Sequence, residues 1–528
     1  MLTPCVAGVA TITDKPGKFQ TPSEFFSELV IRAVQDAGFA PKQIAHLVTD
    51  VVTIRMQPEN MGVGYKNLAH QVSKRAGVWN PSCRYYKTSN GGDTPQKLVN
   101  QFSNKIALGE SKICILVGGE LLDTFIKLAT KTQSQPEWGS EFEEQDEAVP
   151  ECLALGNFTP EVNDLERRNR LTAPKEMYAM MDQASRQEKR SFSNAFEENA
   201  KLFDALNLVA SNQPPGVSWF PTRRTSMDIA TPSKTNRWVS FPYTKYMNSV
   251  IQVNQGACIV LIAEEVLMSL SSLPRPIFLR GGGECVEPGF CVSERPQMYT
   301  SFGMMESINA ALAHAGVKSA KMEIQEFDLY SCFPIALRVA KEHLGLDNYS
   351  KLTVTGGLPF YGGAGNAYTL CSIAFMVQTL RNKQQPHSLG LVNGNGWFMT
   401  KHSCGIYSNT KTQWIQPEDP MLIQQRANAK AGALVPLELN PNGTGRIESY
   451  IVDSDKRVVA FGRMISSGKR FLASYSGVDL NKFREWDAFG MEVEVSTPGG
   501  EKPNQFTPSH TVQWEQLPKI TIPPPSKL

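Results

Sequence analysis

Apolar and polar positions along this chain repeat in two stretches that predict the same succession of elements. In the first stretch a helix ends at Gly38, and an apolar strand follows that closes at Asp50. In the second stretch Gly316 and Asp328 take these places, at a constant offset of 278 residues. A glycine directly after a periodic apolar run is typical of a helix end. The constant offset therefore predicts two related halves.

Each predicted half continues with a Gly-Gly turn, a helix and a buried strand. We expect the turns at Gly91-Gly92 and Gly362-Gly363, the helices at 95–108 and 367–381, and the strands at 113–117 and 389–392. Alternating helices and apolar strands are typical of a parallel sheet covered by helices. The sequence therefore predicts an α/β fold built twice.

Two further segments depart from this α/β pattern. Residues 121–246 are polar and irregular, but helical stretches such as 195–205 favour a folded, lid-like insertion over disorder. After about residue 429 the chain changes to short strands of period two, which is typical of a small OB-like barrel. We expect those strands at 445–452, 458–464 and 470–475. The expected domains are residues 1–120 with 247–275 (first half), 121–246 (insertion), 276–428 (second half), 429–515 (barrel) and 516–528 (proline-rich tail).

Composition narrows the class of protein. The chain has 528 residues, 41% of them apolar, which is enough for two or three domains with substantial cores. Its net charge of +2 is too small to indicate a basic surface for binding nucleic acid. No segment offers the run of about 18 apolar residues that spans a bilayer, and the first twenty residues lack a secretion signal. We therefore expect a soluble, non-secreted protein without nucleic-acid or membrane partners.

The ten cysteines stand singly and form no CxxC pair, so we expect neither a metal nor a redox site.

The last residues indicate where the protein works. Ser526, Lys527 and Leu528 form the tripeptide that the peroxisomal import receptor reads at a free carboxyl terminus. The preceding residues 520–525, ITIPPP, are expected to hold the tail extended and away from the body, because prolines cannot continue a helix. Coincidence is the alternative, since three residues carry little information. The sequence thus predicts a peroxisomal protein that the import receptor binds.

Four segments together resemble the thiolase superfamily over roughly residues 1–420. They are residues 91–120, which run from a Gly-Gly turn into Gly-Gly-Glu, residues 254–261 (NQGACIVL), residues 328–333 (DLYSCF) and residues 355–366 (TGGLPFYGGAGN). The resemblance is strongest to thiolase-like proteins type 1 and the sterol carrier protein X thiolases. It implies a thiolase fold, in which duplicated βαβαβαββ halves form five layers, α/β/α/β/α.

The chain departs from the thiolase pattern at each catalytic position. Thiolases use a cysteine nucleophile, an activating histidine, a second cysteine and oxyanion donors. In this sequence the nucleophile position falls on Gly92, the first histidine on Tyr330 and the second histidine on or next to Gly363. The final cysteine falls within 393–395. Cysteine-based acyl transfer is therefore not expected by the usual route.

Other polar residues stand near these positions. Tyr330 and Tyr361 are candidate acid or base groups, Asn393 and Asn395 are candidate oxyanion donors, and His402 could reach the same place. Some thiolase-fold proteins without the cysteine are retro-aldolases that act on 3-hydroxyacyl-CoA through tyrosines. The alternative is that these tyrosines and the histidine are packing residues with satisfied polar atoms.

A basic group in the insertion suggests the ligand. Arg223, Arg224 and Lys245 fall in the segment that, by the resemblance, covers the nucleotide end of coenzyme A, where cations suit its phosphates. Surface solvation is the alternative. We expect coenzyme A or an acyl-CoA as ligand and no permanently bound cofactor.

Three functions stay open on this sequence. The first is a binder of acyl-CoA thioesters in fatty-acid or sterol metabolism without cysteine-based thiolase activity. The second is a tyrosine-based retro-aldolase or acyltransferase on CoA esters, and the third is a non-catalytic scaffold or carrier. Thiolases pair through their sheets, but the extra domain could block that surface, so a monomer or a weak homodimer is expected.

Overall fold

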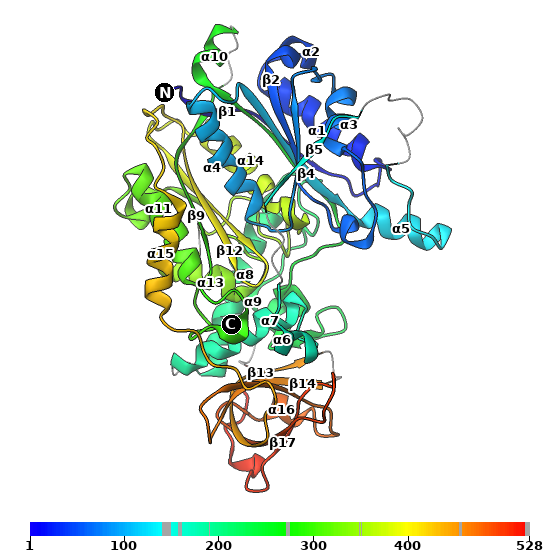
Figure 1. Cartoon of the computed structure of the whole chain (residues 1–528), viewed down its shortest axis with the longest axis vertical. Helices are drawn as coiled ribbons and strands as arrows, with labels where there is room; N and C mark the ends of the chain where they lie inside the picture. The colour runs from blue at the N-terminus through cyan, green and yellow to red at the C-terminus, as the bar shows by residue number, and fades with distance from the viewer. Residues whose placement is uncertain are drawn as a thin grey trace.

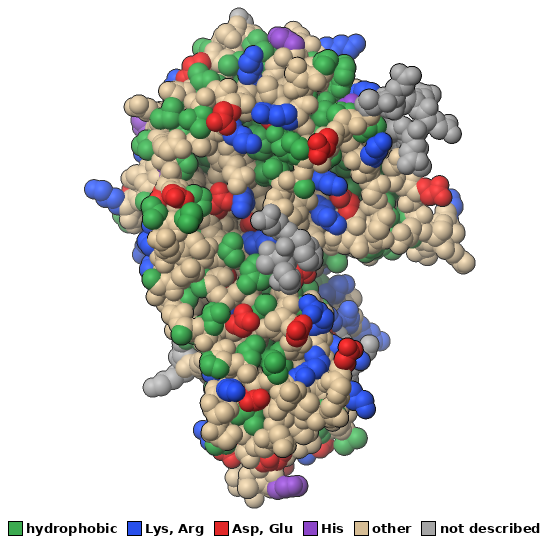
Figure 2. Space-filling model, in the orientation of Figure 1, with side chains coloured by type: hydrophobic (Ala, Val, Ile, Leu, Met, Phe, Trp, Pro, Cys, Tyr) green, Lys and Arg blue, Asp and Glu red, His purple; other side chains and the backbone are tan. Residues whose placement is uncertain are grey.

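The computed structural model describes residues 1–139, 149–156, 161–188, 191–270, 275–347, 349, 351–453 and 457–522. Figure 1 shows an elongated molecule with an α/β body at one end and a small β domain at the other, and the space-filling view of Figure 2 shows the same outline. Residues 141–147, an acidic stretch of the insertion that the sequence predicts to be a solvated loop, and the tripeptide 526–528 lie outside the described residues.

The α/β body contains both predicted halves. Its first half is built from β1 (Pro4–Thr13), α1 (Pro22–Asp36), α2 (Pro41–Ile44), β2 (Val48–Thr53), α3 (Leu68–Ala76), β3 (Arg84–Thr88), α4 (Thr94–Ala107), β4 (Ile113–Leu121), β8 (Asn254–Ala263) and α10 (Glu264–Ser269). Its second half is built from β9 (Ile277–Val286), α11 (Phe302–Ala315), α12 (Ala320–Glu323), β10 (Glu326–Asp328), α13 (Pro334–His343), α14 (Tyr368–Arg381), β11 (Leu389–Gly396), β12 (Lys401–Ser408) and α15 (Pro420–Ala431).

The strands of both halves join edge to edge through a short pairing of β1 with β9. The strand order across the joined sheet is β10-β11-β12-β9-β1-β8-β4-β2-β3-β5. Helices α4 and α14 lie between the two halves of this sheet and contact strands of both. Helices α1 and α3 cover the outer face of the first half, and α11 covers that of the second (Figure 1). This is the five-layer thiolase-like arrangement that the resemblance predicts.

The glycine and the aspartate of the repeat have the same structural roles in both halves. Gly38 and Gly316 follow α1 and α11 with φ values of 84° and 69°, which favour glycine. Asp50 and Asp328 are fully buried. Asp328 ends β10 as predicted, but β2 continues past Asp50 to Thr53, because the residues after Asp50 still pair with β3 and β4. Asp328 accepts hydrogen bonds from both Thr353 and Thr355, while Asp50 pairs with an arginine and a serine. Each buried aspartate thus holds the segments next to its strand by hydrogen bonds. The predicted duplication is confirmed in the structure.

The insertion is joined to both neighbouring domains by strands. It contains α5 (Leu122–Thr132), β5 (Cys152–Leu155), α6 (Asp164–Arg168), α7 (Pro174–Ala184), α8 (Phe192–Asn212), α9 (Ser226–Ala230), β6 (Trp238–Phe241) and β7 (Tyr243–Thr244). Strand β5 extends the body's sheet beside β3, and β6 pairs with the small β domain. The lid expected from sequence is therefore anchored at two places by backbone hydrogen bonds.

The small β domain is a closed five-stranded barrel, as its alternating sequence predicts. Its elements are β13 (Gly443–Asp453), β14 (Arg457–Met464), β15 (Arg470–Tyr475), α16 (Lys482–Glu485), β16 (Glu492–Ser496) and β17 (Gln505–Pro508). The strands follow the order β14-β15-β17-β16-β13, and the pairing of β13 with β14 closes the barrel. The OB-like prediction is confirmed.

The proline-rich tail is not held away from the body over its described part, contrary to the expectation from sequence. The Ile520 N–H donates to the Glu485 carbonyl at 2.8 Å, and the Asp487 N–H donates to the Pro518 carbonyl at 2.8 Å. Ile520 and Ile522 pack partly buried on the apolar core. These bonds and the partly buried isoleucines hold the tail against the protein up to residue 522, whereas residues 523–525 lie outside the described residues. Among the described residues, no helix is both long and apolar enough to cross a bilayer.

Candidate functional site

The corner where thiolases carry their nucleophile lies between β3 and α4, at Gly92. A Cβ atom added to Gly92 would overlap the hydroxyl oxygen of Tyr330 and would lie 2.6 Å from the carbonyl oxygen of Asn395. Thr369 Oγ1 donates to the Gly92 carbonyl at 2.5 Å, which fixes the backbone there. The place of a nucleophilic side chain is thus occupied by Tyr330.

Tyr330 follows β10 and points its ring into the core between the two halves. Its N–H donates to Asn393 Oδ1 at 2.9 Å, and its ring meets that of Tyr368 edge to face at 5.5 Å. Burial raises the pKa of the Tyr330 hydroxyl well above its usual value, and nearby Cys332 and Asp93 act in the same direction. The hydroxyl is therefore neutral, and the phenolate form that a tyrosine base requires is less populated than in a free tyrosine.

Asn395, on β11, belongs to a buried hydrogen-bonded group with Tyr178 of the insertion. Asn395 Nδ2 donates to the Tyr178 hydroxyl at 2.9 Å, and that hydroxyl donates to the Trp397 carbonyl at 2.6 Å. The Tyr178 ring stacks on Phe333 with centroids 4.5 Å apart. Helix α7 thus brings a residue to the centre that sequence reasoning missed, because Tyr178 lies in the insertion and matches no thiolase motif.

Each asparagine at this corner keeps one polar atom unused within the described structure. Asn393 Nδ2 and Asn395 Oδ1 are buried there without a hydrogen-bond partner. The free Asn393 amide is a donor, as an oxyanion site requires, whereas the free Asn395 atom is an acceptor. The two residues predicted as oxyanion donors therefore do not act alike.

Tyr361 and Tyr330 both contact the ring of Tyr368. The rings of Tyr361 and Tyr368 are 6.3 Å apart, and Tyr361 also packs on Phe375 at 5.2 Å. Burial raises the pKa of the Tyr361 hydroxyl well above its usual value. Both predicted tyrosines therefore pack against the ring of Tyr368, and the hydroxyl of Tyr361 is buried without a hydrogen-bond partner among the described residues.

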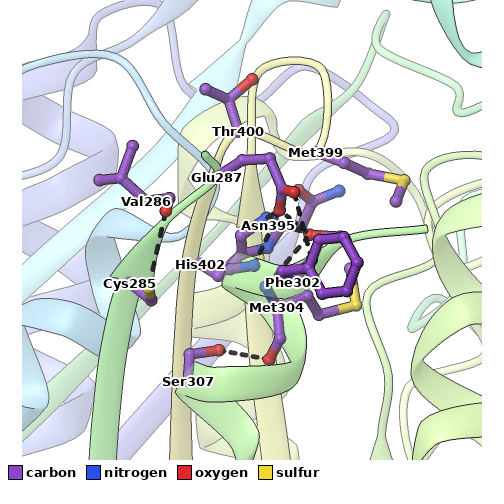
Figure 3. Close-up of polar contacts among 12 residues, drawn as sticks. Cys285, Val286, Glu287, Phe302, Met304, Ser307, Asn395, Met399, Thr400 and His402 are labelled. Carbon is purple, nitrogen blue, oxygen red and sulfur yellow. Dashed lines mark hydrogen bonds and ion pairs between the residues drawn. The ribbon is translucent and has the colours of Figure 1, made fainter. Parts of the chain in front are cut away.

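His402 is placed on β12, beside Asn395 of β11, and is enclosed by a polar cluster. Its Nε2 lies 3.0 Å from Ser301 Oγ and 3.9 Å from Glu287 Oε2. Figure 3 shows His402 close to Glu287 and to Phe302 at the start of α11. Burial lowers the pKa of His402 to about 3. The histidine is therefore neutral, and its ordered partners favour a structural role.

The segment around Gly363, where thiolases carry a second histidine, packs against the insertion and is hydrogen-bonded to it. The Gly363 N–H donates to the Val250 carbonyl at 2.8 Å, while the N–H groups of Trp219 and Phe220 donate to the carbonyls of residues 361 and 360. Phe360 itself is fully buried and packs on Phe203. Backbone hydrogen bonds and buried aromatic rings therefore cover this side of the centre.

The predicted cations gather at the surface of the insertion. The Arg224 guanidinium lies 4.4 Å over the Tyr246 ring, beside exposed Lys245, whereas Arg223 pairs with Asp204. Partial burial acts to raise the pKa of Tyr246, but hydrogen bonds with Thr235 and Arg224 and the neighbouring cations lower it below its usual value. Arg224 and Lys245 thus form one positive patch, while the charge of Arg223 is compensated.

Comparison with known proteins agrees with this fold. No family model matches the chain, and no curated protein matches it. A solved structure, a monomeric SCP2-thiolase like protein type 1 from Mycobacterium smegmatis, is similar to it with a TM-score of 0.80 and 28% identity. The match covers 96% of this chain and 99% of that chain, barrel included. The chain therefore has a thiolase-like fold.

The body also contains a buried carboxyl group with a raised pKa, that of Glu120. Glu120 ends the Gly-Gly-Glu motif on β4, and both of its oxygens accept the Gln57 N–H, at 2.9 and 3.1 Å. Burial raises the pKa of Glu120 to about 8. A Cβ at Gly365 would overlap its Oε1, so the close approach requires a glycine there. Within the described ranges, no three His, Cys, Asp or Glu residues come together as metal ligands do.

Proposed function

We propose that this thiolase-like protein binds acyl-CoA thioesters and does not cleave them by cysteine chemistry. The observation that carries the second part is the overlap at Gly92, where the Tyr330 hydroxyl fills the space that a nucleophile's Cβ would need. Without a nucleophilic side chain at this corner, no covalent acyl intermediate can form there. Binding of the CoA ester is then the function that the fold retains.

The positive patch supports the binding part of the proposal. Arg224 and Lys245 offer charge-assisted hydrogen bonds to phosphate oxygens, and the Tyr246 ring supports the Arg224 guanidinium from below. The chain then runs within four residues from Lys245 to Ser249, whose hydroxyl donates to the Cys332 carbonyl at 2.9 Å. A nucleotide bound at the patch would therefore lie within a short chain length of the former catalytic corner.

The geometry disfavours tyrosine-based lyase chemistry. A tyrosine base needs a lowered pKa, whereas burial raises the pKa of both Tyr330 and Tyr361. Turnover of 3-ketoacyl-CoA with CoA, or of 3-hydroxyacyl-CoA, is expected to be absent when followed by mass spectrometry. Cleavage of either substrate that is lost in Tyr330→Phe would replace this proposal with the lyase.

Calorimetric titration with CoA, an acyl-CoA and 3′,5′-ADP tests the binding. We expect all three to bind, and Arg224→Ala and Lys245→Ala each to weaken binding about tenfold, through loss of a charge-assisted hydrogen bond. Lys112→Ala removes an exposed lysine on the body and is the matched control. Absence of binding, or equal loss in the control, would favour a scaffold whose centre is closed by residues such as Phe360.

The proposed location is the peroxisome, on the condition that Ser526-Lys527-Leu528 stands at a free carboxyl terminus. A fluorescent protein fused ahead of the chain should collect in peroxisomes, and deletion of Leu528 should leave it in the cytosol. Equal distribution of the two fusions would remove the import receptor from the partners proposed for this chain.

A further inference from the structure

A cavity of about 530 Å³ lies on the body beside the C-terminal half of α4. Its walls come from α4, from β9, from His314 near the end of α11 and from the segment 414–420 that leads into α15. Neither Gly92 of the corner nor Arg224 of the positive patch is among its lining residues. Cavities of this size with a few polar groups are typical of small-molecule sites.

Part of the cavity wall is apolar and held in place. Its apolar side chains are those of Leu279, Trp414, Pro417, Pro420 and Ile423. The Trp414 ring is buried and meets the His314 ring edge to face, with centroids 5.6 Å apart. His314 Nδ1 accepts the Gly282 N–H at 3.1 Å, and its Nε2 donates to the Ile415 carbonyl at 2.9 Å. The aromatic side of the cavity is therefore fixed by contacts within the protein.

The charges of the lining are already compensated. Among the described residues that line the cavity, none is a lysine or an arginine. Glu284 Oε2 lies 3.0 Å from Lys97 Nζ, and Glu418 accepts two hydrogen bonds from Arg426, at 2.5 and 2.8 Å. Asp419 Oδ1 accepts a backbone N–H at the start of α15, where the helix dipole also favours its charge. Because a charged ligand would find no free counter-charge, the lining favours an uncharged one.

Uncharged hydrogen-bonding groups of the lining indicate what that ligand carries. Gln101 and Asn104 stand three residues apart on α4, so their carboxamides share one face of the helix. Asn104 Oδ1 and Trp414 Nε1 are buried without a hydrogen-bond partner among the described residues. The first atom is an acceptor and the second is a donor. Since buried polar atoms without partners are costly, this pair favours a ligand with both a donor and an acceptor.

We propose that this cavity binds an uncharged molecule with a planar amide group. The amide carbonyl accepts a hydrogen bond from Trp414 Nε1, the amide N–H donates to Asn104 Oδ1, and the apolar part of the molecule packs on the wall around Ile423. Open-chain carboxamides and the cyclic amides of nucleobases share this chemistry. The site goes beyond the proposed CoA-ester binding and does not rest on it, because it uses neither the corner nor the patch.

Calorimetric titration of the full chain with benzamide tests the proposal, and three molecules of the same shape are its counterparts. Benzoate is an anion, benzylammonium is a cation, and acetophenone keeps the carbonyl but has no N–H. We expect benzamide to bind and each counterpart to bind at least about tenfold more weakly, through a missing hydrogen bond or an unpaired charge. Uracil represents the cyclic amides. Tighter binding of benzamide would assign the site to open-chain carboxamides, and tighter binding of uracil to cyclic amides.

Asn104→Leu removes the acceptor and keeps a side chain of similar size. It should weaken benzamide binding about tenfold, through loss of a hydrogen bond, and leave the weak binding of acetophenone unchanged. Asn212→Leu is the matched control, because Asn212 is an exposed asparagine at the end of α8 and does not line the cavity. It should bind benzamide as the unchanged protein does. Asn104 is only half-buried, so leucine should be tolerated there, and thermal unfolding of both variants checks this.

Four results would overturn the proposal. The first is the absence of binding of both benzamide and uracil at millimolar concentration. The second is binding of acetophenone as tight as that of benzamide, which would leave the buried polar atoms to water. The third is tighter binding of benzoate or benzylammonium than of benzamide, and the fourth is equal affinity of Asn104→Leu and Asn212→Leu for benzamide.

Discussion

The hydroxyl of Tyr330 lies where a side chain at Gly92 would begin. In the thiolase motif these two positions carry a histidine and a cysteine that work together. Here a long side chain and a glycine fit one another, since the ring can reach the corner only where the Cβ is absent. Glycine at position 92 and tyrosine at position 330 thus depend on one another for packing.

Gly92→Ala is the direct test of this fit. The added Cβ overlaps the Tyr330 hydroxyl, so we expect destabilisation of about 1–3 kcal/mol from overpacking. Tyr330→Phe removes the overlapping oxygen, so the same alanine should cost less in the Tyr330→Phe background. Urea denaturation of the two single variants and the double variant measures this coupling.

Gly64→Ala is the control for that experiment, because a Cβ there meets no atom within 4 Å and its φ is not left-handed. It should change stability by no more than a few tenths of a kcal/mol. Equal effects at Gly64 and Gly92, or additivity of Gly92→Ala with Tyr330→Phe, would show that the hydroxyl does not occupy this corner.

Much of the fold was predictable, because local sequence patterns determine its helices and strands. The helix predicted at 95–108 is α4, and the apolar run predicted at 113–117 lies within β4. The alternation of 470–475 gives β15 with the same bounds. Periodicity and helix-ending glycines decide such elements before tertiary contacts form.

The surroundings of the corner could not be predicted, because they depend on packing between distant segments. Tyr178 meets Asn395 only because the insertion docks on the second half. The sequence also did not show where the Tyr361 side chain points. In the structure its ring packs beside Phe375 in the apolar core. The Gly92 position could be located from the motif, but nothing in the sequence said what fills it.

The contact between the barrel and the insertion is expected to contribute strongly to stability. Arg186 and Asp487 form a buried two-pronged ion pair across this contact, with Nη1 2.6 Å from Oδ1. Arg186→Ala leaves a buried carboxylate without its partner, and should cost about 3 kcal/mol or more. The exposed pair Arg167–Asp164 is the control, and Arg167→Ala should cost at most about 1 kcal/mol. Similar shifts in denaturation midpoint for both variants would contradict the assigned role.

The protein is expected to be a monomer in sedimentation velocity. Strand β5 occupies the edge of β3, and the Ser89 N–H donates to the Leu155 carbonyl at 2.9 Å, so this edge is not free to pair with a second copy. Gly156→Val should loosen β5, because its side chain would overlap Ser89, and should produce concentration-dependent association. Gly216→Val has a similar positive φ with open space around it, and should remain monomeric. A dimer of the unchanged protein would refute this reasoning.

Stability is expected to fall with rising pH because of Glu120. Its pKa rises from 4.5 to about 8 on folding, since burial penalises the charged form. The folded state therefore holds this proton more tightly than the unfolded state. Its contribution is fully present below pH 4.5 and is lost as pH rises towards 8, by at most about 1.4 kcal/mol per pH unit.

Glu120→Gln keeps an oxygen for the Gln57 N–H and removes the titration, so the free energy of unfolding should depend less on pH between 5 and 8. Denaturation at a series of pH values measures the difference between variant and unchanged protein. Glu323→Gln is the control, because hydrogen bonds from the Ser319 and Lys318 N–H groups lower the pKa of Glu323, and its titration falls below this window. If Glu120→Gln and the unchanged protein lose stability in parallel from pH 5 to 8, Glu120 is ionised in the folded state and the burial assigned to it does not govern its charge.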